Sequence, residues 1–217
     1  MHAPGKIASA WIVRPALPGD VQGMSRSLAR AFYDDPVWRW FMPADATRAR
    51  RLERMFATLT RKVYLRYGDD CYTTEGHEGA ALWVPPGPGK LSIGDVVRVL
   101  PGWIKAIGWR DLLRVQRGID SFERVHPPEP HYYLAFVGVS PEFQGCGLGT
   151  ALVRAVLDKC DREQKPAYLE ATSVGSRTCY ERIGFLTRAE EHLPAGGPPF
   201  WTMWRPPASL KDTRASD

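Results

Sequence analysis

The chain has 217 residues, a formal net charge of +5 at pH 7 and 44% hydrophobic residues, a size and composition that fit one globular domain. No apolar run reaches the roughly 18 residues of a membrane-spanning helix, and residues 2–9 lack the apolar stretch of a secretory leader. We therefore expect a soluble, cytoplasmic protein. Its positive charge suits a small anionic ligand better than it argues for nucleic acid.

The N-terminal part of the chain predicts a strand and two helices. Residues 11–14 form the strand, and Asp20 is the expected N-cap of a helix that ends near residue 32. Pro36 is expected to break the chain. A second helix follows over about residues 46–67, where apolar residues recur at helical spacing. Its solvent face is expected to carry a cluster of arginines, Arg48, Arg50, Arg51 and Arg54.

The remaining elements continue this alternation. Residues 71–74 and 80–84 read as a hairpin, and a helix over 111–124 ends before the proline-rich residues 126–130. In the C-terminal half, strands and helices alternate around a mixed sheet, which is an α/β pattern. We expect strands over 131–139, 167–172, 185–190 and 200–204, and helices over 147–164 and 177–183.

The cysteines argue against a metal site. They are widely spaced, and no two of them form a Cys-x-x-Cys pair, which predicts reduced thiols rather than disulfides or bound zinc. They are Cys71, Cys146, Cys160 and Cys179. We expect no metal, nucleic-acid or membrane partner, and the sequence leaves monomer and homodimer open.

A glycine-rich stretch, Gln144-Gly145-Cys146-Gly147-Leu148-Gly149-Thr150, lies between the strand over 131–139 and the helix after it. Such a turn presents backbone N–H groups and the positive end of a helix dipole, and its glycines let a phosphate approach closely. A phosphorylated cofactor is therefore expected. The phosphate-loop pattern is absent and the dinucleotide pattern fails at Thr150, although Glu170 stands where a ribose-binding acid would fall.

The pattern that remains, Q-x-x-G-x-G, resembles motif A of the GCN5-related N-acetyltransferase (GNAT) superfamily, whose loop holds the pyrophosphate of acetyl-CoA. Residues 131–141 and 168–172 resemble that family's fourth and fifth strands, and residues 179–185 resemble its motif B. The resemblance is closest to the puromycin N-acetyltransferase-like branch. Relatives often carry Asn where this chain has Ser176.

The resemblance implies one N-acetyltransferase domain over 1–217, with a mixed, mostly antiparallel central sheet flanked by helices. Its acceptor-side half would cover about 1–125, its acetyl-CoA-binding core about 131–205, and a frayed tail 206–217. The implied cofactor contacts are Val137, Gly138, Val139, Gln144, Gly145, Cys146, Gly147, Leu148, Gly149, Thr150, Ser176 and Tyr180. Backbone N–H groups of Val137 and Val139, on a splayed strand, would stabilise the developing oxyanion.

Two residues are candidates for the proton transfers. Tyr180 matches the motif B tyrosine, and its phenol is protonated at neutral pH, so it would protonate the departing thiolate. A packing role is the alternative. Glu170 would accept the amine proton directly or through water, or it is a structural carboxylate. His131 and His77 are rival bases.

Acids and aromatic residues of the strand over 131–139 and the N-terminal half would bind the acceptor: Asp34, Asp35, Trp38, Trp83 and Tyr132. The implied activity is acetyl-CoA-dependent acetylation of a primary amine on a small molecule, such as an aminonucleoside antibiotic, in a bacterial protein. Two alternatives stay open. One is an N-acetyltransferase that acts on a protein or peptide, and the other is a non-catalytic module that senses coenzyme A.

Overall fold

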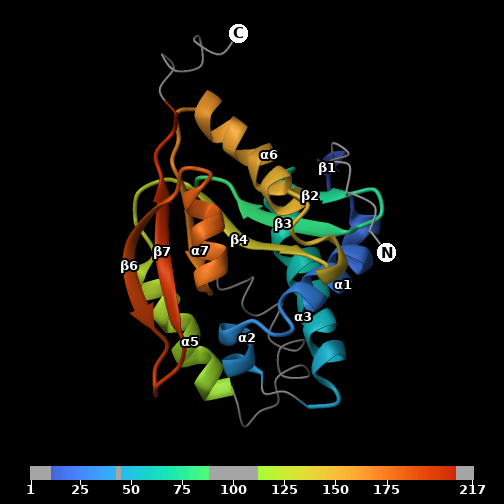
Figure 1. The fold of residues 1–217 in the computed structure, drawn as a ribbon, viewed down its shortest axis with the longest axis vertical. Helices are drawn as coiled ribbons and strands as arrows, with labels where there is room; N and C mark the ends of the chain where they lie inside the picture. The colour runs from blue at the N-terminus through green and yellow to red at the C-terminus, as the bar shows by residue number, and fades with distance from the viewer. Residues whose placement is uncertain (1–10, 43–44, 88–111, 209–217) are drawn as a thin grey trace, which may run out of the picture.

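The structure, a computed structural model, describes residues 11–42, 45–87 and 112–208. Within these residues a seven-stranded sheet has the order β1-β2-β3-β4-β5-β7-β6 (Figure 1). Only β4 and β5 pair in parallel; every other neighbouring pair is antiparallel. The strands are β1 (Val13–Pro15), β2 (Cys71–Thr74), β3 (Gly79–Val84), β4 (Tyr132–Val139), β5 (Ala167–Ala171), β6 (Leu186–His192) and β7 (Pro199–Arg205). The predicted mixed, mostly antiparallel sheet is confirmed.

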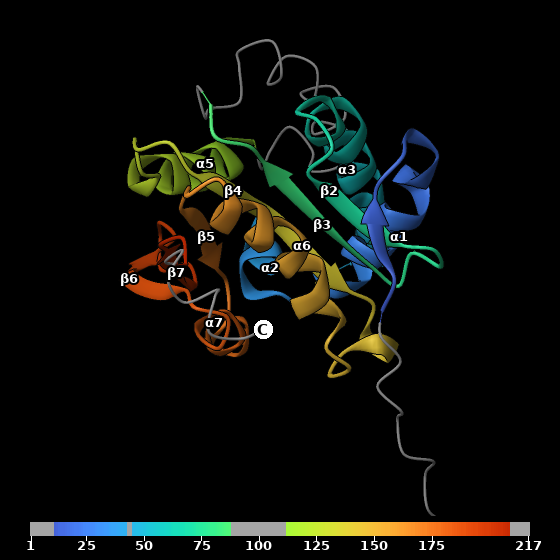
Figure 2. The ribbon, with the colours of Figure 1, turned by 90° about the horizontal axis from the view of Figure 1, so that it is seen from above.

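Helices cover both faces of this sheet (Figure 2). They are α1 (Val21–Ala31), α2 (Pro36–Phe41), α3 (Arg48–Lys62), α5 (Leu112–Val125), α6 (Leu148–Arg162) and α7 (Val174–Glu181). Buried residues of α1, α2, α3 and α5 form one apolar core, and those of α6 form a second. Neighbouring residues of β3 alternate between the two cores, as a strand buried on both faces requires. None of the described helices is long and apolar enough to span a bilayer.

Two helix starts differ from the sequence prediction because of capping. Pro36 does not break the chain but opens α2, since its missing N–H is not needed at that position and the Asp35 carboxylate accepts the N–H of Trp38 at 3.0 Å. The helix α7 begins earlier than predicted because Ser173 caps it. At α1 the N-cap position is Asp20 as predicted, but its carboxylate binds Arg14 instead of the helix N–H groups.

The predicted solvent face of α3 is wrong for one arginine. Arg48 has 0% relative exposure, and its guanidinium donates to the carbonyl oxygens of Tyr33, at 3.0 and 2.7 Å, and Trp38, at 3.3 Å. These two carbonyls lie on either side of Asp35. The buried guanidinium therefore holds the segment between α1 and α2 in place, because it makes three charge-assisted hydrogen bonds to the carbonyls of that segment. The helix itself ends at Lys62, followed by a short 3-10 turn over Tyr64–Arg66.

A bulge in β4 changes which way its second half faces. Leu82 pairs with Phe136 and Trp83 with Leu134, so Ala135 is the extra residue. Ala135 and Phe136 consequently both contact the core of α1 and α3, whereas Val137 and Val139 contact the core of α6. The bulge lies in the part of β4 that lines a cavity.

Candidate functional site

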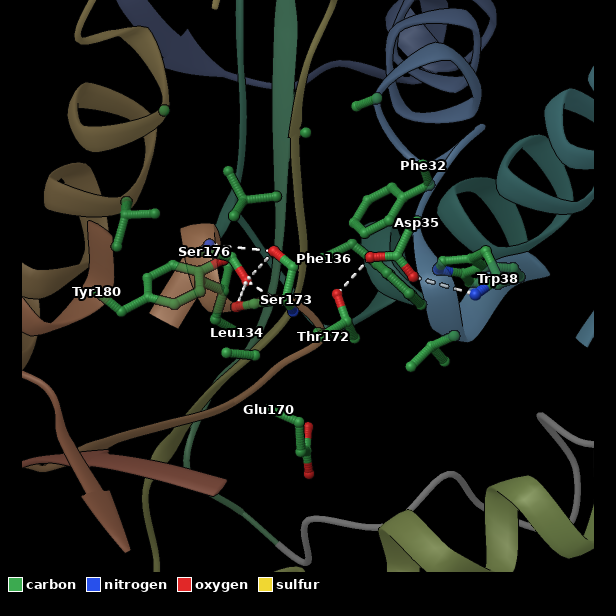
Figure 3. A pocket seen from close by; sticks show the side chains of 18 of the residues that line it. Phe32, Asp35, Trp38, Leu134, Phe136, Glu170, Thr172, Ser173, Ser176 and Tyr180 are labelled. Carbon is green, nitrogen blue, oxygen red and sulfur yellow. Dashed lines mark hydrogen bonds between the residues drawn. The ribbon is translucent and has the colours of Figure 1, made fainter. Parts of the chain in front are cut away.

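A cavity of about 830 Å³ connects the glycine-rich loop with the aromatic residues of the N-terminal half. One side is built by β4, the start of α6 and α7, and the other by α1, α2, α3 and α5. Figure 3 shows Tyr180 and Ser176 at one end of the view, Asp35 with Trp38 at the other, and Thr172 between them. The cavity therefore joins the two halves that the sequence assigned to cofactor and acceptor.

The strands β4 and β5 separate inside this cavity. Only two residue pairs join them, Tyr132 with Ala167 and Tyr133 with Tyr168. Beyond these pairs the parallel ladder stops, although β4 continues to Val139. The predicted splayed strand is thus present in the structure.

The bulge directs two N–H groups of β4 toward this gap. The N–H of Tyr132 donates to Pro166 on the β5 side at 2.9 Å, and that of Ser140 donates to Glu78 on the β3 side at 2.8 Å. Residues an even number apart in a regular strand point their N–H groups the same way, so the bulge accounts for the reversal. N–H directions alternate from one residue to the next along a strand. Because the N–H of Ser140 points toward β3, those of Val139 and Val137 point away from it. They face the gap where β5 no longer pairs.

The glycine-rich loop offers an open start to α6. Gly145 and Gly147 have φ of 73° and 80°, the left-handed region that glycine adopts without strain. A Cβ built on either of them meets nothing within 4 Å, so the space beside the loop is open. Gly147 is the N-cap of α6 and no side chain caps this helix start. An open helix N-terminus beside glycines fits a pyrophosphate.

Tyr180 projects from α7 into the cavity. Its ring packs edge-on against Phe185 at 5.9 Å, and within the described residues its hydroxyl makes no hydrogen bond. Burial, together with the neighbouring Cys179 and Asp35, raises the pKa of Tyr180. The phenol therefore keeps its proton at neutral pH and has it available for a bound molecule.

The hydroxyl of Ser176 is committed to capping α7. It donates to the carbonyl of Ser173 at 2.9 Å and accepts the N–H of Ser173 at 3.2 Å, while the Ser173 hydroxyl accepts the N–H of Ser176 at 3.1 Å. Ser176 lines the cavity, as predicted, but its side chain orders the helix that carries Tyr180.

Asp35 lies at the acceptor end and contacts both halves of the chain. Besides capping α2 it accepts a hydrogen bond from the hydroxyl of Thr172, the residue after β5. Burial raises the pKa of Asp35, opposed by the hydrogen bonds from Thr172 and Trp38. A carboxyl whose pKa moves toward neutrality is suited to exchange a proton there.

Glu170 lies on β5 in the same cavity, with a side chain 5% exposed. Its Oε1 atom has no hydrogen-bond partner among the described residues, and Nδ1 of His126 lies 3.9 Å from it. The rival bases lie elsewhere. His77 sits in the β2–β3 turn with its Nε2 on Asp20, and Nδ1 of His131 contacts the Glu129 carbonyl at 2.6 Å. Neither is among the cavity-lining residues.

Four predicted site residues lie outside the cavity. The carboxylate of Asp34 is exposed and lies 3.7 Å from Arg39, since it follows the end of α1 on the solvent side. Trp83 has 0% exposure because the inward face of β3 buries it in the α6 core. Tyr132 faces that core too and donates to Glu163 at 2.8 Å, and the carbonyl of Cys146 accepts from Trp11 at 3.0 Å.

The other predicted cofactor residues all line the cavity, and so do Asp35, Trp38, Glu170 and Tyr180. Sequence reasoning missed the rings of Phe32 and Phe136, the hydroxyl of Thr172 and the imidazole of His126. Thr172 carried a weak signal, because it ends a predicted strand that contains Glu170. His126 carried none, since it follows α5 in a proline-rich connector.

Comparison with known proteins agrees with this geometry. The model of the acetyltransferase (GNAT) family matches residues 105–185. An uncharacterized N-acetyltransferase of Schizosaccharomyces pombe is 25% identical over 191 residues, which are 80% of this chain and 74% of that protein. A structure of histone acetyltransferase HPA2 and related acetyltransferase from Corynebacterium glutamicum is 27% identical, with a TM-score of 0.72, over 93% of this chain and 98% of that one.

A more distant neighbour has the same fold. It is a Drosophila melanogaster polyamine N-acetyltransferase, an enzyme that forms N-acetylagmatine, with 18% identity, a TM-score of 0.56 and coverage of 90% of this chain and 99% of that one. The matched family and the structural neighbours support the GNAT superfamily as the class of this chain. The family match and the relatives named acetyltransferases support N-acetyltransferase activity for this chain. The puromycin-type branch is not confirmed by these matches.

Proposed function

We propose that this enzyme transfers the acetyl group of acetyl-CoA to a primary amine of a small molecule, by direct attack with both substrates bound. The observation that carries the proposal is the separation of β4 from β5 between the glycine-rich loop and Tyr180. It leaves two backbone donors facing a cavity that the uncapped start of α6 and the side chain of Tyr180 also line. Acetyl-CoA supplies a thioester, whose carbon is the electrophile and whose thiolate is the leaving group.

The binding roles follow from the open groups of the chain. The N–H groups at the start of α6 and of the loop over 145–149 would hold the pyrophosphate. The N–H groups of Val137 and Val139 would donate to the carbonyl oxygen as negative charge develops there. These donors are fixed by the strand, so they need no reorganisation during the reaction.

The acceptor amine reacts only after losing a proton. Its nitrogen then forms a bond to the carbonyl carbon, the carbon–sulfur bond breaks, and the departing thiolate takes the phenolic proton of Tyr180. The nitrogen loses its second proton as the amide forms, and solvent carries a proton back to Tyr180. The amine proton goes to a carboxylate. The sequence proposes Glu170 for that role, and the structure adds Asp35, because both line the acceptor end of the cavity.

The walls of the acceptor end favour an amine on an apolar body. The rings of Phe32, Trp38 and Phe136 pack around it, with Trp38 and Phe136 6.0 Å apart. Aromatic walls bury an apolar body, and the carboxylates attract the ammonium group. An aminonucleoside antibiotic belongs to this class of amines. A protein N-terminus is the second acceptor class, and the free hydroxyl of Tyr180 counts against a module that only senses coenzyme A.

A thiol-release assay with purified protein, acetyl-CoA and a panel of amines tests the proposal. We expect amphipathic small amines to be acetylated better than polar aminoglycosides and better than peptides. Thiol release with peptides alone would refute the small-molecule acceptor. Binding of acetyl-CoA without release on any amine or peptide would refute the enzymatic proposal.

A further inference from the structure

Glu170 is a buried acid without a matching cation. Within the part of the chain that the structure describes, no arginine or lysine pairs with it, and Oε1 lacks a hydrogen-bond donor. Burying a carboxylate in this way costs folding free energy unless a cation or a set of donors compensates. The position of the acid in a cavity wall allows a ligand to supply that cation.

Aromatic side chains from several elements lie near this acid, and all of them except Tyr168 line the cavity with it. Tyr133 comes from β4, Tyr168 from β5, Tyr64 from the turn after α3, and His126 from the connector after α5. The ring of His126 lies 4.9 Å from that of Tyr133 and 5.1 Å from that of Tyr168. Burial chiefly, and the charge of Glu170 in addition, raise the pKa of all three tyrosines, and hydrogen bonding to Glu170 raises the pKa of Tyr133 and Tyr168 further. The donors around this acid are therefore neutral hydroxyls. We call these five residues the Glu170 cage.

The cage is chemically selective for a cation. Neutral tyrosine rings attract a cation through their faces, and the carboxylate adds a direct charge interaction. An anionic group would be repelled by Glu170 and also by Glu123, which lines the same cavity from α5. Among the described residues the imidazole of His126 is the competing partner of Glu170, with its Nδ1 atom 3.9 Å from Oε1.

The cage lies apart from the end of the cavity where the leaving group would be protonated. Figure 3 shows Glu170 away from Tyr180 and Ser176, below Thr172 in the view. Asp35 is bonded to Thr172, and Glu170 precedes Thr172 by two residues, about 7 Å along an extended strand. A single acceptor that reaches both carboxylates therefore spans a short distance, inside a cavity that Phe136 and Trp38 also line.

We infer that the preferred acceptor is a primary amine with a second cationic group, and that this second group binds in the Glu170 cage. The inference rests on the proposed acetyl transfer and deepens it. It leaves the proton of the reacting amine to Asp35, because Glu170 stays ion-paired with the other end of the acceptor. The substrate class is then a diamine or an amine bearing a guanidinium or quaternary ammonium group.

The inference is tested by comparing kcat/KM for diamines with kcat/KM for monoamines of the same carbon-chain length. We expect kcat/KM for diaminobutane and diaminohexane to exceed that for butylamine and hexylamine by about 10–100-fold, as a charge-assisted contact provides. In Glu170→Gln this diamine-to-monoamine ratio should fall to near one, whatever happens to the absolute rates. Glu53→Gln, on α3 and not among the cavity-lining residues, is the matched control and should keep the ratio. A wild-type ratio near one, or a ratio that Glu170→Gln leaves unchanged, would overturn the inference.

A binding measurement separates this inference from the proposed function. Hexyltrimethylammonium is a cation whose quaternary nitrogen has no lone pair and no proton to lose, so it cannot be acetylated. Calorimetry should detect its binding to the wild-type protein and at least about 10-fold weaker binding to Glu170→Gln. Absence of binding to wild type overturns the cage even if amines are acetylated. Binding that depends on Glu170, without acetylation of any amine, refutes the proposed function and leaves the cage standing.

Discussion

Thr172 donates its hydroxyl hydrogen to the carboxylate of Asp35, and this bond joins the two halves of the chain across the cavity (Figure 3). Thr172 follows the strand that carries Glu170, and Asp35 caps the helix that carries Trp38. Arg48 fixes the segment that contains Asp35, because its guanidinium donates to the carbonyls of Tyr33 and Trp38. The position of the acceptor wall is thereby set relative to the strand gap in which acetyl transfer is proposed.

Asp35→Asn should keep the fold and change its pH dependence. Asn is as good an N-cap as Asp, and its amide can donate to the Thr172 hydroxyl. Because burial raises the pKa of Asp35 in the folded chain, ionisation destabilises the fold as pH rises through that pKa. The variant should therefore gain stability relative to wild type as pH rises above about 3.9, the ordinary pKa of an aspartate, and we would measure this by urea unfolding across that rise. A relative loss over that range would mean that the hydrogen bonds outweigh burial.

Tyr180→Phe should remove acid catalysis and little else. The ring keeps its contact with Phe185, and the missing hydroxyl leaves no described hydrogen bond broken. We expect turnover to fall by about 10²–10⁴-fold while the Kd for acetyl-CoA stays within a few-fold. Single-turnover kinetics would confirm that the chemical step is the one affected. An unchanged rate of that step would give Tyr180 a packing role only.

Gly147→Val should abolish the rise in melting temperature that acetyl-CoA produces by binding the folded state. A branched side chain would enter the open space beside the start of α6, where phosphate must approach. The positive φ also strains the variant, so Gly196→Val serves as control. Gly196 has a φ of 69°, also with nothing within 4 Å of a built Cβ, and it does not line the cavity. Both variants should melt lower, and only the control should keep the shift; a normal shift in Gly147→Val would refute the pyrophosphate site.

The sequence predicted the parts of this molecule that depend on local pattern. Alternation and turn residues were enough for the β2–β3 hairpin, and the glycines at 145–149 were enough for the turn and the uncapped start of α6. What it missed depends on tertiary contacts. The direction of the Val137 and Val139 N–H groups depends on a bulge at Ala135, which no residue type announces. Trp83 and Tyr132 lie on strands buried on both faces, so their rings were predicted in the site although they face the α6 core.

Arg48→Met should weaken acceptor binding more than cofactor binding. The substitution keeps much of the buried length and removes three hydrogen bonds to two carbonyls that flank Asp35. We expect the KM for the amine to rise by about 10-fold or more, with the KM for acetyl-CoA within about 3-fold, and a stability loss of about 1–3 kcal/mol. Arg50→Met is the control, because Arg50 is exposed on the same helix. Equal rises in both KM values would indicate a general loss of structure.

The pH profiles of two variants identify the proton acceptor. The acceptor amine arrives as an ammonium ion, so an enzyme without its base depends on the small fraction of free amine, which grows as pH rises. With a monoamine, which does not use the Glu170 cage, Asp35→Asn should lower kcat/KM by about 10²-fold or more near neutral pH and recover steadily toward alkaline pH. Glu170→Gln should change kcat/KM by the same factor at every pH. The reverse pattern, with recovery in Glu170→Gln alone, would restore the assignment made from the sequence and leave Asp35 as the cap of α2. Both variants are isosteric with the wild-type side chains, so a difference between their profiles reports the lost charge rather than a lost shape.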